Sequence, residues 1–357
     1  MARSTPIIRD DVDAIVDELG TELAAALGGS DVLVTGGGGF LCSYLVDVLV
    51  TVNDRGLGLP IHVTALDNHS TGLPERLEHL AGRPDVTRLT HDVTQPYPPD
   101  RPAPDWVVHG ASIASPVFYR RFPLETLDAN VSGTRRVLEA AGATARGVLV
   151  LSTSEIYGDP DADNIPTPET YRGNVSCTGP RACYDESKRL AETLCFIAHQ
   201  QWGTRVMAAR PFNVFGPGQR LDDRRLMPDL LAAALEGRDL VLHSDGRATR
   251  ALCYVSDAVR ALLMVLLRGR AGEAYNIGND EAERSVREIA ETVGRAAGHE
   301  TIRFVPSDDP AYLSDNPQRR CPDLTKLRHL GFVPRVTVED AIARTLASYR
   351  AEVASCR

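Results

Sequence analysis

The chain has 357 residues, of which 43% are hydrophobic, and this is enough for a large core and two lobes. Its formal net charge of −9 is spread along the sequence, which argues against a nucleic-acid partner but leaves room for a local basic pocket that binds an anion. No apolar run is long enough to cross a membrane or has the form of a signal peptide, so we expect no membrane partner.

The cysteines indicate a reducing environment. Their number is odd, and none stands in a C-x-x-C pair or in a Cys/His cluster with zinc spacing. The seven are Cys42, Cys177, Cys183, Cys195, Cys253, Cys321 and Cys356. We therefore expect free thiols in a cytoplasmic protein, without a metal site.

The first thirty residues predict a helix that precedes the main fold. Apolar side chains recur at helical spacing and are flanked by acids; they are Val12, Ile15, Val16, Leu19 and Leu23. We expect residues 1–30 to form an amphipathic helix that packs on the surface of the domain that follows.

Apolar strands separated by helices come next. The strands have no polar alternation, and helical stretches such as residues 127–141 lie between them; they are DVLVT at Asp31, HVTALD at His62, WVVHG at Trp106 and GVLVL at Gly147. Such a pattern indicates a parallel sheet covered on both faces. We predict an α/β fold in which residues 31–210 form a Rossmann-type, doubly wound NAD-binding domain.

The loop after the first strand, TGGGGFLC, predicts a dinucleotide site. Glycines such as Gly36 and Gly39 let the backbone approach a pyrophosphate, and the helix that begins near Phe40 and Leu41 offers amide donors and a positive dipole. Asp67 ends the next strand, where a carboxylate binds the adenosine ribose and repels a 2′-phosphate. The sequence therefore favours NAD over NADP.

Further cofactor contacts are expected after the other strands. Asp92 could reach an adenine edge, although an isolated aspartate is more often a cap or turn residue. The other predicted contacts are Asn68, Val93, Ala111 and Ser152.

The segment CYDESK places Tyr184 four residues before Lys188 in a predicted helix, so both lie on one face. The positive charge of Lys188 would favour the Tyr184 phenolate, which otherwise forms only near pH 10, and the lysine could also hold the nicotinamide ribose. One such pair is common by chance, and the glycine loop upstream is what makes it a catalytic candidate.

After residue 210 the composition shifts toward Gly, Pro, Asp and Arg. Helices are predicted at 226–237 and 285–298, a strand that continues as a helix at 253–267, and a strand at 273–279. We interpret residues 211–345 as mainly a smaller, substrate-binding C-terminal lobe, interleaved with returns to the Rossmann domain; this boundary is soft by several residues.

Together the segments VTGGGGF, STSEIYG, YDESK and RPFNVFGPG resemble the extended short-chain dehydrogenase/reductase family, from about Asp31 to Phe332. Within it, GPRACYDESKRLAET, HGASIASPVFY, ATRALCYVSD and NPQRRCPDL are most similar to the UDP-glucuronate decarboxylases. This resemblance implies a UDP-sugar substrate, tightly held NAD and a homodimer. The dimer would pack the helices that hold Leu127–Ala140 and Tyr184–His199.

The resemblance also implies roles for single residues. Thr153 would bridge a sugar hydroxyl to Tyr184, and Ser154 and Glu155 stand where sugar 4,6-dehydratases carry an Asp-Glu pair. Arg320 would lie near the sugar carboxylate and the reacting carbon, with Arg225 and Arg250 on the diphosphate. The remaining substrate contacts would be Ser115 and Asn213.

The expected reaction starts with removal of the C4 hydroxyl proton by Tyr184 as the C4 hydride passes to NAD. The resulting 4-keto sugar is a β-keto acid, which loses carbon dioxide to give a UDP-4-keto-pentose or, after reduction, UDP-xylose. A nucleotide-sugar 4-epimerase or 4,6-dehydratase is the alternative, and a non-catalytic NAD sensor is a third hypothesis.

Two positions depart from the family pattern. Cys42 stands where the third fingerprint position is usually glycine, and we expect a slight shift of helix against strand without loss of NAD. Gly218 follows FGP, where the decarboxylases tend to carry an arginine, so one substrate contact stays open.

Overall fold

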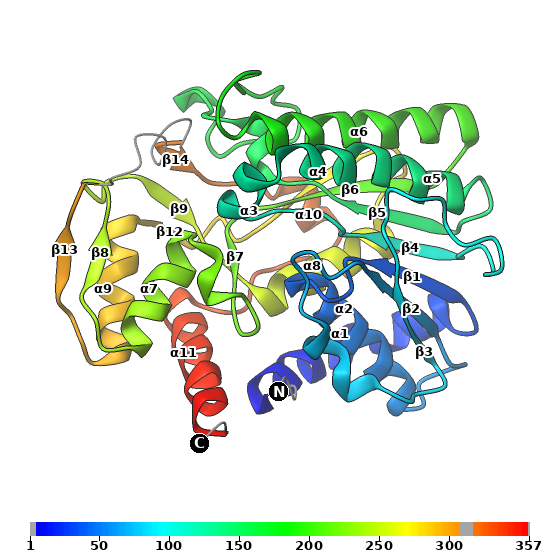
Figure 1. The fold of residues 1–357 in the computed structure, drawn as a ribbon, viewed down its shortest axis with the longest axis horizontal. Coiled ribbons are helices and arrows are strands. Elements are labelled where there is room, and N and C mark those ends of the chain that lie inside the picture. Colours follow the sequence, from blue (N-terminus) through cyan, green and yellow to red (C-terminus); the bar gives the residue numbers. More distant parts are fainter. Residues whose placement is uncertain (1–4, 307–316, 356–357) are drawn as a thin grey trace.

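The computed structural model describes residues 5–306 and 317–355. Its main element is a seven-stranded parallel sheet with the order β11-β6-β5-β4-β1-β2-β3 (Figure 1). The strands are β1 (Asp31–Thr35), β2 (His62–Asp67), β3 (Val86–Thr90), β4 (Trp106–His109), β5 (Gly147–Leu151), β6 (Val206–Pro211) and β11 (Ala274–Ile277). The run from β3 to β6 is the order of a doubly wound Rossmann sheet, which confirms the predicted fold class.

Helices cover both faces of this sheet, because its strands are apolar on both sides. Figure 1 shows α2 (Phe40–Asp54) and α8 (Val255–Arg268) on one face and α5 (Thr134–Ala141) and α6 (Ala182–Trp202) on the other. In α8, every residue from Val255 to Leu266 is buried. This helix comes from the later part of the chain, so the first lobe needs residues beyond 210 to close its core.

The predicted helix at 127–141 forms, but with an irregular turn. α4 (Pro123–Asp128) runs through a π-helical turn, η2 (Ala129–Gly133), into α5. A Cβ on Gly133 would come within 2.7 Å of the Val93 side chain, so the turn brings its backbone close to the segment after β3. A π turn of this kind is frequent next to functional sites.

The second lobe is small and lies at the left of Figure 1. In it β9 (Thr249–Ala251) pairs antiparallel with β12 (Glu283–Ser285) and parallel with β14 (Arg319–Arg320). The helices of this lobe are α7 (Leu226–Leu235), α9 (Val286–Ala297) and α11 (Val338–Ser355), and a further pair of strands joins β8 (Leu240–Leu242) to β13 (Ile302–Phe304). The division at residue 211 stays a prediction, since β11 and α8 return to the first lobe.

The expected N-terminal helix is α1 (Pro6–Leu27), with Thr5 as its cap. Its apolar side packs on α2 and α8, and its N-terminal part contacts α11. There the buried Asp11 carboxylate accepts hydrogen bonds from Tyr254 and Arg344, each at 2.7 Å. The helix therefore ties the C-terminal helix to the Rossmann sheet, a role that its spacing alone did not predict.

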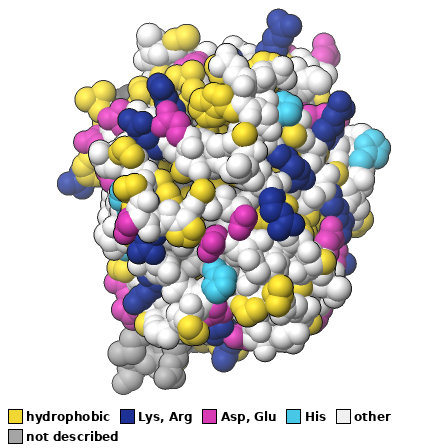
Figure 2. Space-filling view, turned by 90° about the vertical axis from the view of Figure 1, so that its right-hand side faces the viewer, with side chains coloured by type: hydrophobic (Ala, Val, Ile, Leu, Met, Phe, Trp, Pro, Cys, Tyr) yellow, Lys and Arg dark blue, Asp and Glu magenta, His cyan; other side chains and the backbone are white. Residues whose placement is uncertain are grey.

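The surface carries charges of both signs. On the face shown in Figure 2, basic and acidic side chains are interspersed without a continuous basic area. Within the described ranges, the helices all fall short of the length and apolarity that a membrane span needs. The six cysteines in this part of the chain are free thiols, and Cys356 lies outside the described residues.

Candidate active site

A cavity of about 1030 Å³ opens where the carboxyl ends of the sheet strands face the second lobe. Ligands bind at this edge in doubly wound sheets. Fifteen predicted site residues line the cavity: Gly36, Gly39, Phe40, Leu41, Ser115, Ser152, Thr153, Ser154, Glu155, Tyr184, Lys188, Asn213, Arg225, Arg250 and Arg320. The cavity is therefore the candidate active site.

The glycine loop has the close backbone contacts that a dinucleotide site needs. Gly36 has φ +72°, and a Cβ on it would lie 2.8 Å from the Ala111 nitrogen. A Cβ on Gly37 would come within 2.9 Å of Ala65. The loop can take no side chains at these positions and leads directly into the N-terminus of α2, as an NAD site requires.

The other predicted cofactor residues lie beside the cavity or face away from it. Asp67 accepts hydrogen bonds from the Gly38 nitrogen at 2.9 Å and the His69 nitrogen at 2.7 Å, with Gly72 packed against its carboxylate. Ala111 adjoins the glycine loop.

By contrast, Asp92 is exposed, and its carboxylate accepts a hydrogen bond from the Thr94 backbone nitrogen at 2.9 Å. This is the turn role that the sequence offered as the alternative to an adenine contact. The side chain of Asn68 likewise caps Ser70, and Val93 is buried against Gly133. Contacts from these three to a cofactor stay predictions.

Cys42 fits because its neighbour is a glycine. The side chain is buried, and a Cβ on Gly110 would lie only 2.3 Å from the Cys42 sulfur. The family pattern leaves space here by having a glycine in the helix. In this chain Gly110, directly after β4, leaves the space that the Cys42 side chain occupies.

We expect Gly110→Ala to destabilise the fold, because the new methyl overlaps the Cys42 sulfur. Overpacking of this kind typically costs about 1–3 kcal/mol of the free energy of unfolding. Adding Cys42→Gly should recover most of that loss, which urea denaturation of both single variants and the double variant can measure. Additive losses in the double variant would show that the two positions do not compensate each other.

Tyr184 lies on α6 and lines the cavity. Its hydroxyl shares a hydrogen bond with Thr153, and its ring stacks on Tyr119 with centroids 5.1 Å apart and planes 8° from parallel. Burial raises the pKa of Tyr184, and the Thr153 hydrogen bond offsets this only in part. In the ligand-free protein the resting form is therefore the neutral phenol.

Lys188 is buried one turn further along α6. Its ammonium donates to the Leu151 carbonyl at 2.8 Å and lies 5.9 Å from the Tyr184 ring centroid. Burial lowers the pKa of Lys188 to about 8. In the ligand-free state the pKa of Tyr184 is nevertheless raised by burial, so the charge of Lys188 is not enough to make the phenolate the resting form.

Glu155 stands in η3 (Ser154–Tyr157), at the carboxyl end of β5, and binds two arginines. Arg320 donates from both terminal nitrogens to the two carboxylate oxygens, one of these bonds at 2.8 Å, and Arg181 donates to the same carboxylate. Burial alone would raise the pKa of Glu155, but Arg320 and Arg181 outweigh it and lower the pKa to about 2. The carboxylate is therefore ionised at any working pH.

The other predicted substrate residues line the same cavity as this cluster. Arg250 is buried, and burial together with nearby Arg320 lowers its pKa to about 10. Arg225 is held by Asp223 at 2.7 Å, Ser115 donates to the Asp223 carbonyl, and Asn213 donates to the Ala251 carbonyl. The cavity thus has an arginine-rich wall, although the whole chain is acidic.

The second departure, Gly218, has a conformational basis. Its φ of +82° is one that other residues rarely adopt, and its carbonyl accepts a hydrogen bond from Arg76. Arg76 also donates to the Gly38 carbonyl at 3.1 Å and lines the cavity. An arginine at 218 would be strained in this loop.

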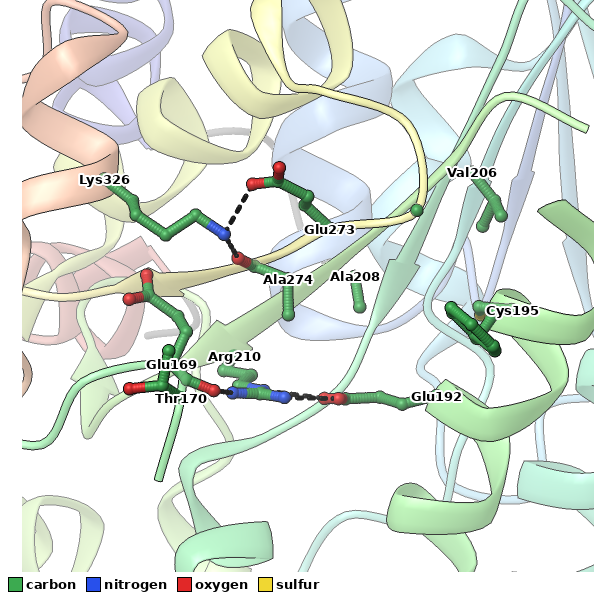
Figure 3. A pocket seen from close by; sticks show the side chains of 12 residues that line it. Glu169, Thr170, Glu192, Cys195, Val206, Ala208, Arg210, Glu273, Ala274 and Lys326 are labelled. Carbon is green, nitrogen blue, oxygen red and sulfur yellow. Dashed lines mark hydrogen bonds and ion pairs between the residues drawn. The ribbon is translucent and has the colours of Figure 1, made fainter. Parts of the chain in front are cut away.

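A second cavity, of about 310 Å³, lies beside β6, β11 and α6 (Figure 3) and contains none of the predicted site residues. In Figure 3 two pairs of its charged side chains point at one another: Arg210 binds Glu192 at 2.6 Å, and Lys326 binds Glu273 at 2.8 Å. Both pairs are ion pairs between side chains of the protein itself, so they give no reason to expect a charged ligand in this cavity.

Arg181, Tyr119 and Arg76 are among the residues that line the large cavity but were not singled out from the sequence. Arg181 stands three residues before Tyr184 inside a segment that carried the resemblance, so a signal was present. Tyr119 likewise ends the segment HGASIASPVFY, which carried the resemblance, whereas Arg76 lies in none of those segments and comes to the cavity only through the fold.

A doubly wound sheet, a glycine loop with an acid after β2, and a buried Tyr/Lys pair define a dehydrogenase-like protein of the short-chain type. The chain belongs to the NAD dependent epimerase/dehydratase family, whose model matches residues 32–278.

Individual relatives agree. UDP-glucuronic acid decarboxylase 5 of Arabidopsis thaliana is 39% identical over 312 residues, covering 87% of this chain and 86% of the relative. UDP-glucuronic acid decarboxylase 1 of Xenopus tropicalis is 36% identical over 326 residues, covering 90% and 72%. Among solved structures, a dTDP-glucose 4,6-dehydratase of Streptomyces venezuelae with NAD bound is 26% identical, with a TM-score of 0.79 and coverage of 91% and 98%.

Proposed function

We propose that this protein is an NAD-dependent UDP-glucuronate decarboxylase that acts through a 4-keto intermediate and yields UDP-4-keto-pentose, UDP-xylose or both. One observation carries the proposal: Glu155 and Arg320 form a charged pair in the same cavity as Tyr184 and the glycine loop. An arginine there suits a sugar that carries a carboxylate.

NAD is the cofactor that the residues fit. The glycine loop and the N-terminus of α2 would hold its pyrophosphate, and Asp67 would hold its adenosine ribose. When bound, NAD supplies an acceptor, and later a donor, for the C4 hydride.

The residues of the chain would do the acid–base work. Tyr184 takes the proton of the C4 hydroxyl, with Thr153 orienting both hydroxyls. Lys188 keeps a positive charge close to the phenol, and a cationic nicotinamide would add to it. These charges are needed because burial holds the phenol neutral.

Loss of carbon dioxide needs no dedicated base, because the 4-keto acid releases its electrons into the ketone. Arg320 would bind the carboxylate first, and this pairing must weaken as carbon dioxide leaves. Glu155, which stays ionised, would lie beside the reacting carbons.

A nucleotide-sugar 4-epimerase or 4,6-dehydratase is the second candidate, since solved structures of both kinds share this fold. Ser154 argues against dehydration, because a hydroxyl cannot replace the aspartic acid of that reaction. Incubation with UDP-glucuronate, UDP-glucose and dTDP-glucose, followed by mass spectrometry, separates them. We expect loss of carbon dioxide from UDP-glucuronate only, and loss of water from a glucose nucleotide would refute the proposal.

We expect NAD to stay with the protein through purification, because the glycine loop and Asp67 provide both parts of a dinucleotide clamp. Chromatography of the heat-released supernatant should show NAD and no NADP. A folded protein that carries neither and prefers NADP on titration would contradict the role of Asp67.

We also propose a homodimer, which is supported by the resemblance to the UDP-glucuronate decarboxylases and by exposed apolar side chains on α4 and α6. These are Leu124, Leu127, Leu190 and Ile197. We expect sedimentation to give twice the chain mass, and arginine at both 190 and 197 to give monomers. A monomeric wild type would exclude this interface.

A further inference from the structure

Glu155 has more cationic partners than one carboxylate needs. Its Oε2 accepts from both Arg181 and Arg320, while its Oε1 accepts from Arg320 alone. The side chains are largely buried, with exposed fractions of 18% for Glu155, 16% for Arg181 and 9% for Arg320. The cluster is thus a carboxylate held between two guanidinium groups.

The two arginines come from different parts of the fold. Arg181 directly precedes α6, the helix that carries Tyr184, and its Nε lies 3.7 Å from Asp185 on the same helix. Arg320 comes from the second lobe, on the short strand β14. Arg181 is therefore held at the start of α6, whereas Arg320 belongs to the second lobe.

The proposed reaction asks Arg320 to bind a second carboxylate, that of the sugar. A guanidinium has five donors, so Arg320 can share itself between two acceptors, but each then receives fewer bonds. Without another partner, Glu155 would become a buried carboxylate next to the carboxylate of the substrate. Such an arrangement is costly, because like charges repel and burial removes water.

We propose that Arg181 is a positioning residue, which holds the Glu155 carboxylate ionised and in place while Arg320 turns to the substrate. This inference rests on the proposed function and names a residue to which no role was assigned. Arg181 needs no contact with the substrate for this task; it acts through Glu155.

The surroundings of Glu155 determine the expected pH dependence. Facing it are Arg320 of β14, Arg181, Arg250 of β9, Tyr184 and Asp185 of α6, and Tyr119 of α3 (Pro116–Arg121). Burial raises the pKa of Glu155 and the arginines lower it, so removal of Arg181 shifts that balance upward. Glu155 would then take up a proton in the acid part of the working range.

The test measures carbon dioxide release from UDP-glucuronate between pH 5 and 9. For Arg181→Gln we expect kcat to fall about 10- to 100-fold with little change in KM, and to fall further below about pH 6. Arg181→Lys keeps the charge and should restore the wild-type pH profile. Arg238→Gln, which removes an exposed arginine paired with Glu236, is the matched control and should change neither quantity.

A double-mutant cycle separates positioning from support of the fold. In a Glu155→Gln background, where there is no carboxylate for Arg181 to hold, Arg181→Gln should add no further loss. An equal loss in both backgrounds, or an unchanged pH profile in Arg181→Gln, would overturn the inference. A wild type that releases no carbon dioxide would instead refute the proposed function, and the inference would fall with it.

Discussion

Tyr184→Phe should reduce sugar oxidation by about 10²- to 10⁴-fold, the usual contribution of a general base. The phenylalanine ring keeps the stacking on Tyr119, so only the hydroxyl and its hydrogen bond with Thr153 are lost. NAD binding should not change, because the glycine loop and Asp67 are untouched. Single-turnover absorbance of the bound cofactor after mixing with UDP-glucuronate measures the oxidation step directly.

Tyr97→Phe provides the matched control, since this tyrosine is half-buried in another apolar cluster and does not line the cavity. Its turnover should equal that of the wild type. Near-normal turnover in Tyr184→Phe would show that Tyr184 is an ordinary core residue of α6.

Arg320→Gln is the second large effect that we expect. The change leaves Glu155 without its bidentate partner and the sugar carboxylate without a cation. Truncating one partner of a buried, hydrogen-bonded charge pair costs about 2–5 kcal/mol of binding free energy, which corresponds to roughly 30- to 5000-fold in kcat/KM. Steady-state kinetics with UDP-glucuronate should show the loss in both KM and kcat.

The neighbouring Arg319 is the control for this variant. Its side chain is 47% exposed and binds Glu283, so Arg319→Gln removes the same chemical group one residue away without touching the cavity. A loss of activity that is equal for both arginines would mean that β14 matters as a strand and that Arg320 has no role of its own.

Much of the architecture could be predicted because it depends on local patterns. Apolar strands without polar alternation predicted the parallel sheet, and the glycines before Phe40 predicted the loop that joins β1 to α2. Tyr184 and Lys188 share a helix face by spacing alone, so their common orientation was also predictable.

Contacts across the fold were not predictable in the same way. Glu155 and Arg320 are 165 positions apart, and only the pairing of β14 with β9 brings the arginine to the end of β5. The protonation state of Tyr184 could not be predicted either, because the burial that raises its pKa depends on the packed structure. Arg181 was visible in the sequence, yet its partner became clear only in three dimensions.

The most direct test of the account uses UDP-glucuronate labelled with carbon-13 in its carboxyl group. After incubation with the purified protein, we expect labelled carbon dioxide in the headspace and an unlabelled UDP-pentose or UDP-4-keto-pentose in solution. Retention of the label in a UDP-hexuronate, whether unchanged or inverted at C4, would contradict the central claim and point to an epimerase.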